Sequence, residues 1–207
     1  MKQTDRRPIA ARSSAWAKFV TRALVRTSIT PNQISCVSVL FAVLGATALL
    51  AMTAPAGMLL CAACIVLRLL CNMFDGMVAV DGNKGTPAGA LFNEIPDRLA
   101  DSLFLVALGY AAALPWLGWL CALLAALTAY VRVLGGSLGL TQDFRGPMAK
   151  PHRMWLQVAT LLLAAALLPW RHELLLAGAG LIAAGSALTC IWRARAIAMR
   201  LRQGNAA

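Results

Sequence analysis

Apolar residues run through this chain in six long segments, and short polar turns separate them. An α-helix rises about 1.5 Å per residue, so a segment of roughly 20 apolar residues crosses a bilayer. The pattern therefore predicts an all-α integral membrane protein with six transmembrane helices. The predicted helices cover residues 31–53, 58–80, 87–114, 116–134, 154–168 and 174–192.

A local signal marks the start of the first and third predicted helices. Thr30-Pro31 and Thr86-Pro87 each place a threonine at the cap and a proline at the first helical position. The threonine oxygen accepts a hydrogen bond from a free backbone N–H, and proline has no N–H to leave unsatisfied. We predict that both helices begin at these prolines.

A different pattern precedes the first span. Apolar residues recur there at helical spacing, whereas Lys18, Arg22 and Arg26 lie off the apolar stripe. The stripe consists of Trp16, Phe19, Val20, Ala23 and Leu24. This predicts an amphipathic helix that lies in the headgroup region and directs its basic side chains toward anionic lipid.

Composition agrees with a membrane protein. The 207 residues are 60% hydrophobic and 13% charged, whereas soluble domains are about half apolar and about a quarter charged. The net charge of +11 comes from basic residues at the ends of apolar segments, which favours membrane lipids over nucleic acid as the partner. We predict a basic N-terminal segment with its juxtamembrane helix, residues 1–29, and one six-helix domain, residues 30–207.

The basic residues also predict the orientation of the chain. Six spans place both termini and the loops 81–86 and 138–153 on one side, and nearly all Lys and Arg residues lie there. The opposite loops hold only Arg171. By the positive-inside rule, both termini are cytoplasmic in a bacterial-type inner membrane.

The second and third spans carry polar residues that a membrane helix rarely tolerates. One face of the second span holds Arg68, Asn72, Asp75 and Ala79, and one face of the third holds Gly89, Asn93, Asp97 and Asp101, with Glu94 beside it. Ionisable groups inside a bilayer are costly and mark a functional site by default. Oxygen ligands on two facing helices favour Mg²⁺ or Mn²⁺, which clamp a pyrophosphate. Alternatively, the acids only pair with Arg68, Arg98 and Arg132.

These residues resemble the signature of the CDP-alcohol phosphatidyltransferase family, D-x-x-D-G-x-x-A-R, eight residues, and G-x-x-x-D-x-x-x-D. The chain has N-x-x-D-G-x-x-A-V at residues 72–80, then eight residues, then G-x-x-x-N-x-x-x-D at residues 89–97. The spacing matches, but Asn72 and Asn93 replace aspartates and Val80 replaces the arginine. In a second register, Asp97 and Asp101 are the last two aspartates, because a four-residue shift keeps the same helix face.

The resemblance implies a membrane phosphatidyltransferase of phospholipid biosynthesis and a homodimer. Such an enzyme moves a phosphatidyl or related phospho-alcohol group from a CDP-linked donor, CDP-diacylglycerol, to the hydroxyl of a small alcohol or phospho-alcohol and releases CMP. It implies Asp97 as the general base and a metal set of Asn72, Asp75, Asn93, Glu94, Asp97 and Asp101. The residues that accommodate the nucleotide are Gly76, Ala79, Thr86 and Gly89.

A second basic group implies a site for the acceptor's phosphate. Its members lie late in the fourth span and in the loop before the fifth, and they are Arg132, Arg145, Lys150 and Arg153. Alternatively, this loop contacts lipid headgroups. Since Asn72 and Asn93 weaken metal binding, a non-catalytic relative that binds nucleotide or lipid is the alternative to an active transferase, and a small transporter is a third hypothesis.

Overall fold

The computed structural model describes residues 14–204 and is helical within them. The elements are α1 (Ala15–Val25), α2 (Pro31–Ala51), α3 (Ala56–Asp81), α4 (Gly89–Ala111), α5 (Pro115–Ser137), α6 (Lys150–Ala166), the short η3 (Leu168–Trp170) and α7 (Arg171–Gly204). The predicted all-α class is confirmed. Residues 1–13 of the predicted N-terminal segment lie outside the described part.

Within residues 14–204, four stretches of helix are long and apolar enough to cross a membrane: α2, α3, α5 and the combined segment of η3 and α7. Two of the six predicted spans differ from these. Helix α4 carries Glu94, Asp97, Arg98 and Asp101 in its first half, and α6 has only 17 residues. Six spans therefore stay a prediction, although all six predicted segments are helical.

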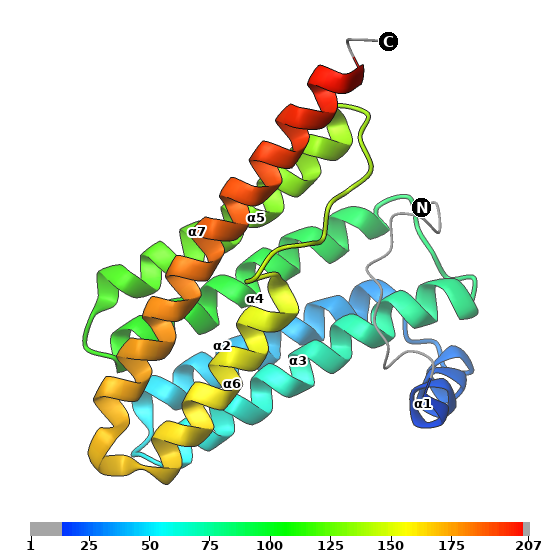
Figure 1. The fold of residues 1–207 in the computed structure, drawn as a ribbon. Coiled ribbons are helices and arrows are strands. Elements are labelled where there is room, and N and C mark those ends of the chain that lie inside the picture. The colour runs from blue at the N-terminus through cyan, green and yellow to red at the C-terminus, as the bar shows by residue number, and fades with distance from the viewer. Residues whose placement is uncertain (1–13, 205–207) are drawn as a thin grey trace.

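The helices run alternately up and down in a bundle (Figure 1). Helix α2 packs on α3 and α4, α4 packs on α5, and α5 packs on α7, while α6 fills the space between α3 and α7. Helices α4 and α5 cross at Gly109 and Gly118, where a Cβ added to Gly109 would lie 2.4 Å from the Gly118 Cα. Such small residues let two helix backbones approach closely within a membrane.

One of the two predicted helix starts is confirmed. The Thr30 hydroxyl accepts a hydrogen bond from the Gln33 backbone N–H at 3.3 Å, and the Gln33 side chain accepts one from the Thr30 N–H at 2.9 Å. The prediction for Thr86-Pro87 is wrong, because α4 begins at Gly89. The Thr86 carbonyl instead closes a turn with the Gly89 N–H, and its hydroxyl accepts from Asn32 at 3.4 Å.

Helix α1 packs across the end of α3 at one end of the bundle (Figure 1). It buries Ala17 and Thr21 against Met73 and Met77. Of the predicted apolar stripe, Trp16 packs edge-on against Phe74 of α3, with 5.9 Å between the ring centres, whereas Phe19 is 73% exposed. An exposed apolar face on a helix with basic residues is what interfacial anchoring requires.

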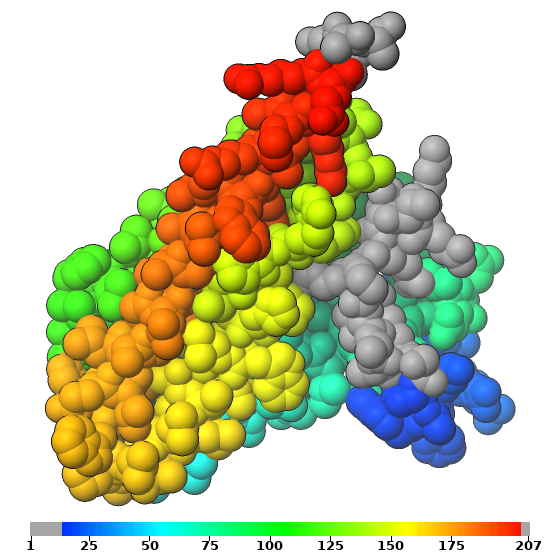
Figure 2. Space-filling model, in the orientation of Figure 1, coloured from blue at the N-terminus to red at the C-terminus, as the bar shows by residue number. Residues whose placement is uncertain are grey.

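The start of α2, the turn 82–88, the connection 138–149 and the end of α7 all lie at the same end of the bundle as α1 (Figure 1). The connection 138–149, yellow-green in Figure 2, lies against α7 on the surface of the molecule. This end collects the polar half of α3 and α4, and we call it the polar end.

Candidate active site

The predicted polar faces of α3 and α4 do meet at the polar end, and a buried arginine joins them. The Arg68 side chain is fully buried. Its Nη2 atom donates to Asp97 Oδ1 at 3.2 Å and to Asp101 Oδ1 at 2.7 Å. It also donates to the Asp97 carbonyl at 3.1 Å. Because a guanidinium stays charged in proteins, these two carboxylates are what make its burial tolerable.

Asp97 has N–H donors on both of its carboxylate oxygens. The Asn72 amide donates to Oδ1, which Arg68 also contacts. The Lys150 ammonium, at the start of α6, forms an ion pair with Oδ2, and Arg98 lies 3.6 Å from the same oxygen. Asp97 and Lys150 are both buried, so this ion pair is shielded from water and is strong.

Asp101 lies deeper in the bundle and serves a different purpose. Arg68 contacts one of its oxygens, and Arg153 contacts the other at 3.0 Å. All three side chains are at most 2% exposed. This triad therefore links α3, α4 and α6, and Gln157 extends the link by donating to the Phe104 carbonyl at 2.8 Å.

Asp75 faces Asp97 but has neutral donors. The Ser35 hydroxyl of α2 donates to Asp75 Oδ2 at 2.7 Å. The two carboxylates, Asp75 and Asp97, repel each other electrostatically. Beside them, the Asn72 Oδ1 atom is buried and accepts no hydrogen bond within residues 14–204. A buried oxygen without a donor is rare in proteins and requires an explanation.

The oxygen atoms of Asn72 and Asp75 fit a divalent cation, whereas those of Asp97 do not. Within the described residues, no three His, Cys, Asp or Glu side chains gather as a metal-binding group. The free Asn72 oxygen and the Asp75 carboxylate fit Mg²⁺ or Mn²⁺, because Mg²⁺ is often held by one or two carboxylates together with waters and substrate phosphates. Asp97 does not fit, because cationic donors already fill its oxygens.

Among the remaining residues of the predicted metal set, Glu94 has cationic partners of its own. Glu94 pairs with Arg132 at 2.5 Å and lies 3.7 Å from Arg98. Asn93 is half-buried one residue before it. The structure thus contains the pairings of acids with Arg68, Arg98 and Arg132 that were the alternative to a metal site.

The predicted nucleotide-binding residues lie at the ends of α3 and α4. Ala79 is buried less than its neighbour Val78, and Gly76 is half-buried on α3. A Cβ added to Gly89 would meet only the Thr86 hydroxyl, at 3.6 Å. The fold itself therefore has room for a side chain at position 89.

The predicted basic group divides into two parts. Lys150 and Arg153 point into the bundle toward the aspartates, as described above. Arg132 and Arg145 belong to the connection 138–149 and its surroundings: Arg132 bonds Gln142 and lies 5.2 Å from the Phe144 ring centre. Arg145 binds Asp143 through two nitrogens, at 3.0 and 2.8 Å. The Arg145 guanidinium hydrogen-bonded to Asp143 lowers the pKa of that carboxyl to about 2.

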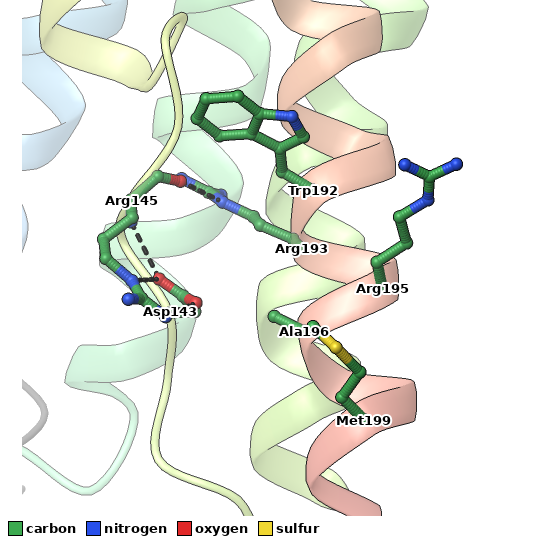
Figure 3. A pocket seen from close by; sticks show the side chains of 7 residues that line it. All are labelled: Asp143, Arg145, Trp192, Arg193, Arg195, Ala196 and Met199. Atoms are coloured by element: carbon green, nitrogen blue, oxygen red, sulfur yellow. Dashed lines mark hydrogen bonds and ion pairs between the residues drawn. The ribbon is translucent and has the colours of Figure 1, made fainter.

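A cavity of about 360 Å³ lies between this connection and α7 (Figure 3). Its lining includes Asp143, Arg145, Trp192, Arg193 and Arg195. Arg193 is buried and holds the connection in place by donating to the Arg145 carbonyl at 2.9 Å. Its Nη2 atom donates no hydrogen bond within residues 14–204.

Sequence reasoning missed the roles of Ser35 and Arg193. Both lie in apolar segments, and a polar residue there is a signal worth following. The signal was strongest for Arg193, which is an ionisable residue at the end of an apolar run. Arg68 was assigned to the correct face, but its bridge between Asp97 and Asp101 was not predicted.

The sequence and the fold have counterparts among known proteins. Phosphatidylinositol phosphate synthase of Mycobacterium bovis (strain BCG / Pasteur 1173P2) is 26% identical over 202 residues, which cover 87% of this chain and 86% of that protein. The synthase of Mycobacterium tuberculosis (strain CDC 1551 / Oshkosh) has the same identity and coverage.

Two solved structures of the Mycobacterium tuberculosis synthase share the fold. The structure with CDP-DAG bound has a TM-score of 0.72 at 22% identity and covers 86% of this chain and 91% of that one. The complex with manganese and citrate has a TM-score of 0.73 at 23% identity, with coverage of 86% and 87%.

A match to a protein-family model shows the family. The model described as CDP-alcohol phosphatidyltransferase matches residues 28–192, which include the two polar helix faces and both basic regions. With its helical bundle and its apolar spans, this chain is therefore a multi-pass membrane enzyme that belongs to the CDP-alcohol phosphatidyltransferase family.

Proposed function

We propose that this enzyme moves a phosphatidyl group from CDP-diacylglycerol to a small phospho-alcohol and releases CMP. The observation that carries the proposal is the meeting of the two motif faces: Asp75 and Asn72 of α3 lie against Asp97 of α4 at one end of the bundle. The relatives support the choice, since they are phosphatidylinositol phosphate synthases and one was solved with CDP-DAG bound.

The donor's pyrophosphate belongs beside Asn72 and Asp75. These two residues would hold Mg²⁺ or Mn²⁺, and such a cation neutralises the charge of the pyrophosphate when it is bound. Manganese is present in one structure of the relative. Gly76, Ala79, Thr86 and Gly89, on α3, in the turn 82–88 and at the start of α4, would leave room for the nucleotide to approach the helix backbones.

Asp97 is the group that takes the proton. It accepts the proton of the acceptor hydroxyl while that oxygen forms a bond to the phosphorus next to the lipid. The bond between this phosphorus and the CMP oxygen breaks, and CMP leaves with the electron pair. Arg68 and Asn72 orient the Asp97 carboxylate for this step by bonding the same oxygen.

The acceptor's phosphate belongs in the cavity beside α7. Arg145, Arg193 and Arg195 line it, and the unused Nη2 atom of Arg193 is a donor for a phosphate oxygen. Arginine presents several N–H groups in a fork that suits phosphate. Arg132 of α5 bonds Gln142 of the same connection and pairs with Glu94 of α4. This favours a phosphorylated alcohol over an uncharged one.

One observation favours a second candidate, a non-catalytic relative. Asp97 is held by Arg68 and Lys150, and such pairing makes a carboxylate a weaker base. If the pairing persists with both substrates bound, the protein binds nucleotide or lipid without turnover.

The test is CMP release by the purified full chain with CDP-diacylglycerol, Mg²⁺ or Mn²⁺, and a panel of alcohols and phospho-alcohols, with the lipid product identified by mass spectrometry. We expect release with a phosphorylated acceptor and a loss of about 100-fold or more in Asp97→Asn, which lacks the base. Glu173→Gln is the matched control, because Glu173 is an exposed carboxylate at the opposite end.

Nucleotide binding without CMP release for every acceptor would establish the non-catalytic alternative. Equal turnover in Asp97→Asn and the wild type would exclude Asp97 as the base. Release with an uncharged alcohol alone would contradict the phosphate site.

A further inference from the structure

We propose that the Lys150 ammonium is a built-in counter-cation of Asp97, which takes the place of a divalent cation there and leaves only Asn72 and Asp75 to bind metal. The inference rests on the proposed transferase function, because it concerns the metal site of that reaction. Its test, however, requires no turnover.

The contacts of Asp97 are the first step. An ionised carboxylate offers about four lone-pair positions on two oxygens. Arg68 and Asn72 use Oδ1, and Lys150 and Arg98 use Oδ2. A divalent cation would have to displace one of these donors to reach Asp97. The Lys150 ammonium already occupies the position at Oδ2 that such a cation would take.

The charge balance of the polar end is the second step. The buried and half-buried carboxylates of α3 and α4 are Asp75, Glu94, Asp97 and Asp101, and the cations within 4.0 Å of one of them are Arg68, Arg98, Arg132, Lys150 and Arg153. Five positive charges thus face four negative ones. Every divalent cation that enters adds two charges to an excess that is already positive, and in a buried site this repulsion is weakly screened.

The asparagines of the motif agree with this balance. Aspartate at positions 72 and 93, as in the family signature, would add two negative charges and give the site a net negative charge. Such a site would bind more divalent cations. The chain has asparagine at both positions. The two neutral residues and the buried lysine therefore belong together, because each one lowers the demand for a divalent cation.

The position of Lys150 is the third step. It is the first residue of α6, where the helix dipole disfavours a positive charge. It is nevertheless buried, with 8% exposure. Arg153, one turn later, anchors the same end of α6 through Asp101. Both the helix dipole and burial disfavour a positive charge at this position, and the ion pair with the Asp97 carboxylate compensates for them.

The experiment is a Mn²⁺ titration of the full chain in detergent, with free Mn²⁺ measured by electron paramagnetic resonance. We expect Lys150→Met to bind Mn²⁺ about tenfold more tightly than the wild type or better, because it removes the buried ammonium from Asp97 Oδ2 and one positive charge from the site. Lys150→Arg keeps the ion pair and should resemble the wild type. Lys150→Met combined with Asp97→Asn should lose the gain. Lys18→Met, which removes an exposed lysine of α1, controls for net charge.

A second variant keeps the inference testable if Lys150→Met does not fold. Lys150→Gln removes the same charge but keeps a polar side chain, and it should also bind Mn²⁺ about tenfold more tightly than the wild type. Mn²⁺ binding by a folded Lys150→Gln that is no tighter than that of the wild type would overturn the inference. Unchanged or weaker Mn²⁺ binding in a folded Lys150→Met would do the same.

The two proposals fail in different ways. If no acceptor supports CMP release but Lys150→Met tightens Mn²⁺ binding, the transferase proposal fails and the counter-cation stands. If CMP is released but Lys150→Met leaves Mn²⁺ affinity unchanged, the counter-cation fails and the transferase stands.

Discussion

The Arg68 guanidinium lies fully buried between α3 and α4, and one of its nitrogens contacts the carboxylates of both Asp97 and Asp101. Breaking a buried ion pair costs more than its net contribution, because it leaves a charge without compensation. Two carboxylates depend on Arg68, so its removal affects the base and the link to α6 at once.

Replacing Arg68 with methionine tests this arrangement. We expect Arg68→Met to lower the free energy of unfolding by about 3–5 kcal/mol, since it leaves two buried carboxylates short of a cation. The measurement is the thermal or denaturant midpoint of the detergent-solubilised protein. Arg171→Met, at an exposed arginine of the opposite end, should change stability by about 0.5 kcal/mol or less. Equal midpoints for Arg68→Met and the wild type would contradict the prediction.

At the scale of the element, α4 carries charged residues among its apolar ones and depends on its neighbours to compensate them. Its charged residues are compensated by Arg68 of α3 and by Lys150 and Arg153 of α6. Its helix continues through Pro96, which removes one backbone hydrogen bond. Packing therefore stabilises α4 where its own sequence does not, and the close crossing with α5 is part of that packing.

The crossing of α4 and α5 gives a second stability prediction. A Cβ added to Gly118 would lie 2.9 Å from the Gly109 Cα and from two α4 carbonyl oxygens. Since these are backbone atoms, the helices must separate, and Gly118→Ala should cost about 1–3 kcal/mol. Gly180→Ala in α7 is the matched control, because nothing lies within 4 Å of the new Cβ. A Gly118→Ala midpoint at or above that of Gly180→Ala would show that the backbones do not meet there.

At the scale of the whole molecule, the polar end holds both the aspartates and the basic cavity, and the other end holds Arg171. Most of the basic side chains outside the spans gather with the site. By the positive-inside rule, we expect the polar end to face the cytoplasm. We propose this topology, with both termini cytoplasmic in an inner membrane, and a homodimer as the assembly.

Reporter fusions test the topology. We expect green fluorescent protein at the C-terminus to fluoresce, because it matures in the cytoplasm, and alkaline phosphatase fused after Arg171 to be active on the opposite side. The exchanged fusions, with the phosphatase at the C-terminus and the fluorescent protein after Arg171, are the control and should both be silent. Activity in the exchanged pair would reverse the orientation and place the site outside.

Much of this protein was predictable from local pattern. The apolar runs predicted helices at all six segments, and Thr30 with Gln33 forms the capping interaction that its spacing favours. Asn72, Asp75 and Asp97 were assigned to facing helix surfaces by their spacing alone. The failure at Thr86 has a local cause: its carbonyl bonds the Gly89 N–H in a turn, so the helix begins later.

The sequence by itself determined the class, the spans of apolar helix and the residues that face one another across α3 and α4, because these follow from periods of a few residues and from the cost of polar groups in lipid. Only the tertiary structure decided which charge compensates which. Lys150 and Asp97 are 53 positions apart in the chain. Many other pairs of opposite charges are also distant in the chain and would be equally plausible partners. Nothing in local spacing selects one of them until α6 packs between α3 and α7 and brings the ammonium to the carboxylate.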